Sequence, residues 1–374
     1  MRHLKNIWTL TIKELRSLFG DVMLVIMIGV VFSVTIYTVA KGISTDVRNA
    51  PIGIVDFDRS TLTRQIRDAL QPPYFRTPVD VARDEVDALM DKGELIFVLE
   101  FPPNFERDVL AGRKPQAQLL IDATAMTQAG VGQAYIAQIY NREIGHFLKQ
   151  PAATTVMPVR PALNVMFNPN GESEWYMPVM EVGNMITLLS LVLVGAAVIR
   201  ENERGTIEHL LVMPVNATEI ALSKILANGI VILGASMLSM ELVVHRFLGV
   251  PLNGSLFLYG VGVAVYLFSI ASLGIMLATV APSMPQFGLL MLPVFVVALL
   301  FSGSAAPRSN MPGAAQFLSE YWPTTQFAAF AQNVLFRGAG IDIVWPEFLI
   351  MATIGAVFLS LALMRFRAML EQQG

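Results

Sequence analysis

The sequence lacks cysteine and is poor in charged residues. Among its 374 residues there is no Cys, and Asp, Glu, Lys and Arg together make up 15%. The absence of cysteine excludes disulfides, thiolate catalysis and cysteine-ligated zinc. A soluble domain carries about 25% charged residues, so the low fraction indicates that much of the chain contacts lipid. The net charge of −3 indicates no surface for nucleic acid.

The sequence also lacks the common motifs for binding phosphate or metal. No Gly-x-x-x-x-Gly-Lys-Ser/Thr loop is present to bind nucleotide phosphates. Gly130 and Gly132 lie in a predicted helix and lack the third glycine of a dinucleotide fingerprint. The four histidines are scattered without metal-ligand spacing; they are His3, His146, His209 and His245. We therefore expect no catalytic residue, no metal and no cofactor bound by this chain.

Long apolar segments predict a polytopic α-helical membrane protein. A helical span needs roughly 20 apolar residues to cross a bilayer core of about 30 Å. The segment 247–307 has no charged residue and is too long for one span, but Pro282 and Pro285 break it into two. Lys224, near the start of another segment, is expected to extend toward the interface. The sequence thus predicts six transmembrane helices, in segments 22–40, 178–199, 220–240, 247–307 (two helices) and 348–364.

Basic residues predict the orientation of these helices, because Lys and Arg accumulate on the cytoplasmic side. The side with more of them has Arg2, Lys5, Lys13, Arg16, Arg200, Arg204, Lys224, Arg365 and Arg367 in its flanks. The other side has only Lys41, Arg246, Arg308 and Arg337 in its short flanks. We therefore expect both termini in the cytoplasm, with helix 1 in residues 21–44, residues 45–175 outside, and the remaining spans in 176–374.

Residues 45–175 are predicted to form an α/β domain inserted between helices 1 and 2. Short apolar strands alternate with helical stretches, which suggests a sheet with crossover helices. Strands are expected near 51–56, 95–101, 117–122 and 161–167, and helices near 60–71, 80–91 and 124–149. Asp56 and Asp58 follow the first strand, as in some phosphotransferases. Capping of the next helix by Asp58 or Ser60 is the favoured interpretation.

Two further segments are predicted to lie at or in the membrane surface. Residues 1–20 contain apolar residues at spacings of three and four with basic residues between them, which favours a helix in the cytoplasmic interface over a plain extension of helix 1. Residues 305–345 are rich in small and aromatic residues. They favour a re-entrant or interfacial hairpin on the outer side, with a simple loop as the alternative.

Two carboxylates lie near the predicted outer ends of spans. Glu181 and Glu241 are candidates for the translocation path, because carboxylates within a membrane are costly. Their closeness to the interface offers a simpler explanation, since water or headgroups can reach them there.

The loop between spans 2 and 3 has the most informative pattern. It concentrates charges and then becomes apolar up to a proline. As a helix, the segment could lie with its apolar face against the membrane domain and transmit movement from a soluble motor subunit. The alternative is a solvated loop. The pattern consists of Glu201, Gly205, Thr206, Glu208, Leu210 and Pro214, with Glu203 between the first two. It resembles the coupling-helix signature, here residues 201–214, of ABC-2-type permeases.

Other segments extend this resemblance over essentially the whole chain. They are similar to the start of the outer domain and to the final hairpin of bacterial drug-export-type members with large periplasmic domains. These segments are 54–60, 300–303, 310–312, 322–325 and 337–338. The stretch 304–306 departs from the family, because its residues are smaller than usual.

The resemblance implies a dimer of six-span subunits, identical or different, in the bacterial inner membrane. A separate ABC ATPase subunit would bind ATP and Mg²⁺, and a periplasmic adaptor protein could dock on residues 45–175. The cargo, leaving the cytoplasm or the membrane, would be drug-like or amphipathic. Two other classes stay open: a membrane-anchored receptor with a periplasmic sensing domain, and an ion-driven secondary transporter.

Overall fold

The chain folds into two units, each of which is described separately. A computed structural model describes residues 2–42, 49–122, 126–148, 173–203, 215–304, 308 and 311–373. One unit combines Met1–Ile43 with Glu174–Gly374 and is almost entirely helical. The other is Ser44–Ser173 and contains the sheet. We call them the membrane unit and the soluble unit.

Among the described residues of the membrane unit, six helices are long and apolar enough to cross a membrane, so the predicted number of spans is confirmed. The break predicted at Pro282 separates α11 (Leu256–Ala278) from α12 (Met284–Phe301). The last helix, α15 (Ile341–Gln373), is longer than predicted. The six candidate spans are Val22–Gly42, Glu174–Glu201, Ala217–Phe247, Leu256–Ala278, Met284–Phe301 and Ile341–Arg365.

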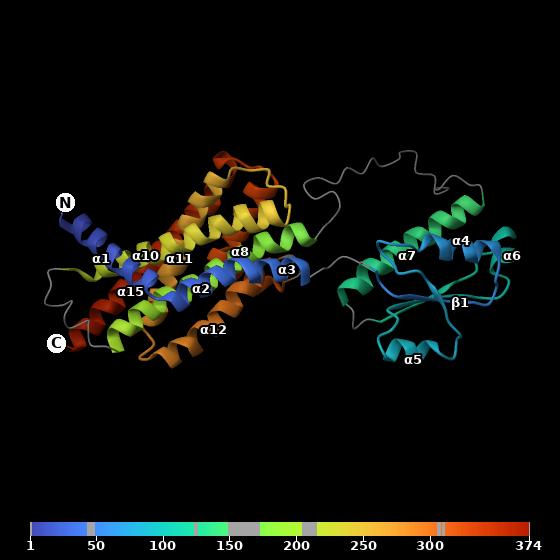
Figure 1. The fold of residues 1–374 in the computed structure, drawn as a ribbon, viewed down its shortest axis with the longest axis horizontal. Helices are drawn as coiled ribbons and strands as arrows, with labels where there is room; N and C mark the ends of the chain where they lie inside the picture. Colours follow the sequence, from blue (N-terminus) through green and yellow to red (C-terminus); the bar gives the residue numbers. More distant parts are fainter. Residues whose placement is uncertain are drawn as a thin grey trace. The chain divides into compact units, whose positions relative to one another are not determined.

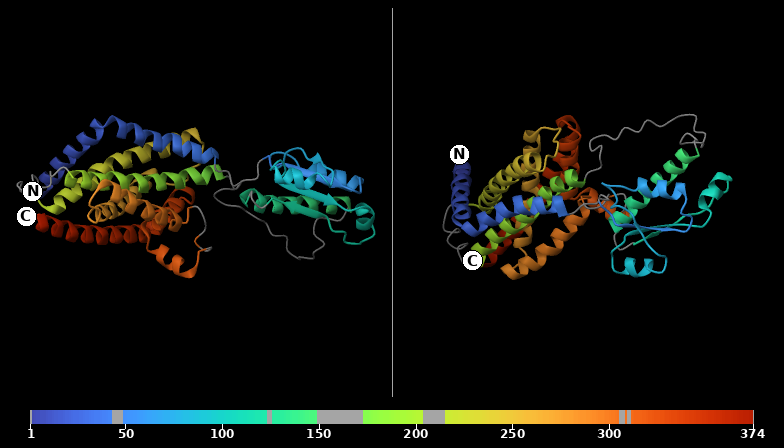
Figure 2. Two further views of the ribbon diagram at one scale, coloured as in Figure 1. Left: turned by 90° about the horizontal axis from the view of Figure 1, so that it is seen from below. Right: turned by 45° about the vertical axis from the view of Figure 1, so that its right-hand side comes forward.

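The N-terminal helix α1 (Arg2–Gly20) is amphipathic and bends into the first span. Leu4, Trp8 and Phe19 expose their apolar side chains, whereas Leu18 is buried. The bend falls at Asp21, whose carboxylate accepts a hydrogen bond from Leu24 N (3.2 Å) and so caps α2 (Val22–Val30). Figure 2 shows this bend, and Figure 1 shows α1 and the end of α15 at the same end of the unit, here called the terminal end.

Two spans continue as π-helix where they meet. The first passes through η1 (Val31–Thr35) into α3 (Ile36–Gly42), and α10 (Ala217–Leu238) continues as η2 (Ser239–Phe247). A π turn interrupts the regular i to i−4 bonding of the backbone. At this crossing Ser239 Oγ donates a hydrogen bond to Phe32 O over 2.5 Å.

The bundle is centred on α8 (Ser173–Glu203) and α11, the two most buried spans. Close approach depends on glycine at two positions. A Cβ on Gly195 would lie 2.0 Å from the ring of Phe287, and one on Gly262 would lie 2.1 Å from Phe330. These helices therefore pack at distances that other residues would not permit.

The segment between the last two spans forms two helices rather than a simple loop. These are α13 (Gly313–Glu320) and α14 (Pro323–Ala331), followed by η4 (Gln332–Phe336). Almost all of α14 is buried in the bundle. Thr324 Oγ1 and Thr325 Oγ1 donate hydrogen bonds to Ala298 O (2.8 Å) and Phe301 O (2.7 Å), which fixes the start of α14 to the end of α12.

In the part of the soluble unit that the structure describes, four strands form a mixed sheet with the order β2-β1-β3-β4. Strand β1 pairs in parallel with β2 and β3, and β4 is antiparallel to β3. Helices α4 and α7 cover one face and α5 the other (Figure 1). The strands are β1 (Ile52–Asp56), β2 (Val79–Asp80), β3 (Phe97–Phe101) and β4 (Gln118–Ile121). The helices are α4 (Thr61–Ala69), α5 (Val86–Asp91), α6 (Phe105–Leu110) and α7 (Met126–Phe147).

Two details of the soluble unit differ from the prediction. The helix expected over 80–91 is shorter, because its first residue belongs to β2 and the helix begins only at Val86. Helix α6 was not predicted, since six residues are too few to show periodicity. The strand expected near 161–167 lies outside the described residues. Gly132, rejected as part of a nucleotide motif, serves packing: its Cβ would lie 2.2 Å from the Phe97 ring.

Candidate functional site

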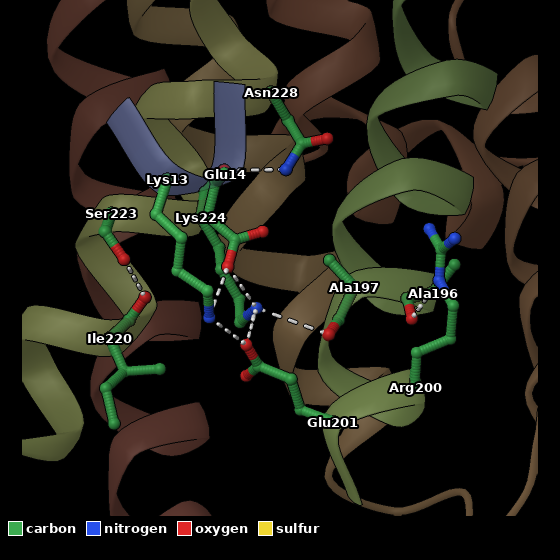
Figure 3. Close-up of polar contacts among 10 residues, drawn as sticks. All are labelled: Lys13, Glu14, Ala196, Ala197, Arg200, Glu201, Ile220, Ser223, Lys224 and Asn228. Atoms are coloured by element: carbon green, nitrogen blue, oxygen red, sulfur yellow. Dashed lines mark hydrogen bonds and ion pairs between the residues drawn. The ribbon is translucent and has the colours of Figure 1, made fainter. Parts of the chain in front are cut away.

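The residue that begins the predicted coupling segment is bound to a buried lysine. Glu201, near the end of α8, lies 3.0 Å from Lys224 Nζ of α10. The same ammonium lies 3.3 Å from Glu14 Oε1 of α1 and donates a hydrogen bond to Ala197 O over 3.3 Å. Only 2% of the Lys224 side chain is exposed. One buried cation therefore joins α1, α8 and α10 (Figure 3).

The prediction that Lys224 extends toward the interface did not include the partners that its ammonium has in the structure. Carboxylates from two other helices neutralise its charge, so the ammonium is bound between α1, α8 and α10. Lys13 lies on the exposed side of the same carboxylates, 3.9 Å from Glu14 and 3.7 Å from Glu201. An exposed, loosely spaced pair of this kind contributes about 0–1 kcal/mol. Lys224 is therefore the structural centre of the cluster.

A second acidic residue of the segment caps another span. Glu203 Oε1 accepts a hydrogen bond from Met284 N (3.0 Å) at the first residue of α12. The first amides of a helix have no partner within the helix, and a carboxylate there also interacts favourably with the helix dipole. Glu203 thus connects the end of α8 to the fifth span.

The helix that follows the segment is fixed to α1. Glu219, buried in the first turn of α10, accepts a hydrogen bond from Asn216 N (3.1 Å). Its two oxygens also contact His3 Nδ1 (2.5 Å) and Asn6 Nδ2 (3.2 Å). The described residues at the start of the segment, Glu201 and Glu203, and Glu219 beyond its end are therefore fixed to membrane helices.

Several members of the predicted site are not described. Gly205, Thr206, Glu208, Leu210 and Pro214 lie outside the described residues, so their assignment stays a prediction. Conversely, the sequence did not single out Glu14, Glu219 or His3. The signal that could have found them is the presence of buried-type charges, Glu219 and Lys224, five residues apart at the start of an apolar helix.

Glu181 and Glu241 are not brought together by any described contact. Glu181 accepts a hydrogen bond from Asn184 Nδ2 (2.9 Å), one turn along α8. Glu241 pairs with Arg246 (2.7 Å) in the same π-helical segment. Both carboxylates are thus satisfied locally, and their role in a translocation path stays a prediction.

A small cavity of about 10 Å³ lies near Asn184 in the bundle. Its lining includes Thr187, which forms a 2.5 Å hydrogen bond with the Tyr266 hydroxyl, and Ser304. The ring of Tyr266 stacks on that of Phe327, with the ring centroids 4.2 Å apart. This volume is enough for about one water molecule, so in this conformation no cargo fits there.

The two aspartates after β1 are used locally: Asp56 accepts hydrogen bonds from Arg59 N (2.8 Å) and Thr63 Oγ1 (2.7 Å), and Asp58 caps a helix. Ser60 Oγ accepts a hydrogen bond from Thr63 N (3.3 Å) at the start of α4, which confirms that Ser60 caps this helix. Asp58 caps α6 instead, through Glu106 N (2.9 Å), and Glu106 Oε2 in turn accepts from Leu62 N of α4 (2.9 Å). Among the described residues there is no acidic or histidine group with the spacing of a metal site.

Known proteins place this chain in a family. The sequence profile of the family described as "ABC-2 family transporter protein" matches residues 21–364. The chain is 45% identical to the inner membrane transport permease YhhJ of Escherichia coli (strain K12), over 98% of both chains. It is 24% identical to the probable multidrug ABC transporter permeases YbhR (94% of this chain, 96% of that one) and YbhS (89% of each) of the same strain.

The matches agree with the helical architecture. Six candidate spans and relatives named as inner membrane or ABC permeases identify a multi-pass inner-membrane protein. These relatives are named as permeases, a term for a transport subunit and not for an enzyme. With the family profile covering most of its length, the chain belongs to the ABC-2 family of transporter proteins.

Proposed function

We propose that this chain is the transmembrane permease subunit of an ATP-driven exporter, and that residues 201–214 receive movement from a separate ATPase. One observation carries the proposal: the first residue of this segment and a residue just beyond its end are fixed to membrane helices. Glu201 contacts Lys224, and Glu219 contacts His3. A displacement of the segment would therefore reach α1, α8 and α10 directly.

The proposal includes an orientation and a set of partners. Both termini and residues 201–214 face the cytoplasm, and the soluble unit faces the periplasm, where it contacts an adaptor or gates release. Two permease subunits form the path, and a pair of ATPase subunits binds ATP and Mg²⁺. Hydrolysis then shifts the dimer between states that open to different sides.

The cargo is proposed to be drug-like or amphipathic. The names of the relatives YbhR and YbhS, probable multidrug ABC transporter permeases, support this choice. The cavity near Thr187 is too small for such a compound, so the cargo would enter in another state, between subunits, or both.

A charge reversal in the coupling segment tests the proposal. Glu208→Lys is expected to reduce substrate-stimulated ATP hydrolysis and export by roughly tenfold or more, a typical size for lost coupling between sites. The protein should still insert and purify as a dimer. Glu320→Lys is the matched control, since Glu320 ends α13, in the loop before the last span, three spans away from the segment and thus on the other side.

Three outcomes would contradict the proposal. Full export and full ATPase capture by the Glu208→Lys variant would refute the coupling assignment. Export that continues without any ATPase would favour the ion-driven alternative. If deletion of residues 50–170 left export unchanged, the soluble unit would have no part in the path.

A further inference from the structure

A crevice opens beside the bend between α1 and α2. It has a volume of about 780 Å³, within the range of ligand sites. Residues of α1, the start of α2, the end of α8 and Lys224 of α10 form its walls. The lining residues that carry the argument are Lys13, Glu14, Asp21, Arg200, Glu201 and Lys224. Figure 3 shows most of these charges, with part of the chain in front removed.

The charges in this crevice balance, with three basic and three acidic side chains. Four of them pair with one another around Lys224, as described above. Arg200 and Asp21 are different. Arg200 Nε donates to Ala196 O (3.3 Å), and the Asp21 carboxylate accepts from Leu24 N (3.2 Å), with no ion-pair partner for either side chain among the residues that the structure describes.

The crevice lies where the apolar part of the first span begins. Its wall passes from the charged residues of α1 through Leu18 to Val22 and Leu24 of α2. The amphipathic α1 and the apolar α2 meet at this point, so the crevice lies at the level of lipid headgroups. A ligand there would meet polar groups on one side and apolar side chains on the other.

We propose that this crevice binds the headgroup of a zwitterionic glycerophospholipid. The guanidinium of Arg200 would bind the phosphate and the carboxylate of Asp21 the ammonium, while the acyl chains follow Val22 and Leu24. Arginine is well suited to phosphate because its planar donors match the phosphate oxygens. The lining has no surplus positive charge, which argues against an anionic headgroup. This inference is independent of the proposed coupling to an ATPase.

Native mass spectrometry of the full-length protein tests the proposal. The protein in detergent is incubated with equal amounts of phosphatidylethanolamine and phosphatidylglycerol, and the retained lipid is counted. The wild type should retain phosphatidylethanolamine preferentially. Arg200→Gln and Asp21→Asn should each lower this retention by roughly tenfold, the effect of losing one charge-assisted hydrogen bond. Arg16→Gln is the matched control, because Arg16 is exposed on α1 and does not line the crevice.

A steric variant tests whether lipid retention depends on the space in the crevice and not only on its charges. Ser17 lines the crevice and is exposed, so Ser17→Trp should fill the space and reduce retention while leaving all six charges in place. Circular dichroism and gel filtration verify folding for each variant. The proposal is overturned if the wild type retains both lipids equally or prefers phosphatidylglycerol. It is also overturned if folded Arg200→Gln or Ser17→Trp retains as much phosphatidylethanolamine as Arg16→Gln.

Discussion

The two ends of the membrane unit are held together by different chemistry. At the terminal end, α1, α8 and α10 meet at the ammonium of Lys224 and two carboxylates. Around α14, toward the other end, the helices meet through aromatic rings. Tyr266 stacks on Phe327, and Phe330 contacts Phe348 edge-on at 5.0 Å.

The difference concerns how each end responds to the loss of one side chain. Close-packed rings share their contacts among many neighbours, and each ring removed leaves a cavity of its own size. The charged cluster depends on one buried cation, so its removal leaves two partly buried carboxylates with only the exposed Lys13 near them. The terminal end is thus sensitive to a change of a single charge, and the aromatic end to a change of volume.

The largest expected effect is at the aromatic end. Phe330 is fully buried, and Phe330→Ala should lower the free energy of unfolding by about 3–5 kcal/mol because it creates a cavity. Thermal unfolding in detergent measures the change. Phe317→Ala is the control, since Phe317 is 63% exposed. Equal effects of the two variants would show that the rings do not form a packed core.

The next effect is at the charged cluster. Lys224→Met should cost about 3 kcal/mol, since it leaves Glu14 and Glu201 without their buried counter-charge. Lys13→Met should cost under about 1 kcal/mol, because Lys13 is exposed. Adding Glu14→Gln and Glu201→Gln to Lys224→Met should restore most of the stability. If the triple variant is no more stable than Lys224→Met, charge is not what the lysine contributes.

A smaller loss of stability is expected where Glu219 ties α10 to α1, through its contacts with His3 and Asn6. Glu219→Gln keeps the shape of the side chain but removes the charge that His3 and Asn6 contact. It should cost about 1–2 kcal/mol, the size of a charge-assisted hydrogen bond. Hydrogen exchange should detect faster exchange in α1. Protection of α1 equal to that in the wild type would show that this tie does not hold the helix.

The smallest effect extends the comparison to the soluble unit. Burial raises the pKa of Glu143, but hydrogen bonds from Gln65 and Arg142 outweigh it, so the pKa is lowered from its ordinary value of 4.5. Since the folded pKa lies below the unfolded one, the stabilisation is complete above pH 4.5 and is lost as pH falls through the folded pKa. Glu143→Gln should remove this part of the acid dependence of unfolding, and an unchanged pH profile would contradict the assignment.

The number of spans could be predicted because it depends only on the lengths of apolar runs. The helix break at Pro282 and the cap at Ser60 could also be predicted, because both depend on neighbouring residues. The cluster around Lys224 could not. Its members are separated by more than 180 residues between α1 and α8, and no periodicity relates positions on three different helices. The reciprocal caps of Asp58 and Glu106 escaped prediction for the same reason.

The length of α8, which is continuous and has one internal proline, Pro178, near its start, has a mechanical consequence. Its 31 residues extend about 46 Å at 1.5 Å per residue. Glu174, near its start, is paired with Lys41 of α3, and Glu201, near its end, with Lys224. Such a helix is stiff along its axis, so an axial shift of Glu201 is accompanied by a shift of Glu174 of nearly the same size. One movement of α8 would therefore act at once on the end of the first span, through Lys41, and on the start of the third span, through Lys224.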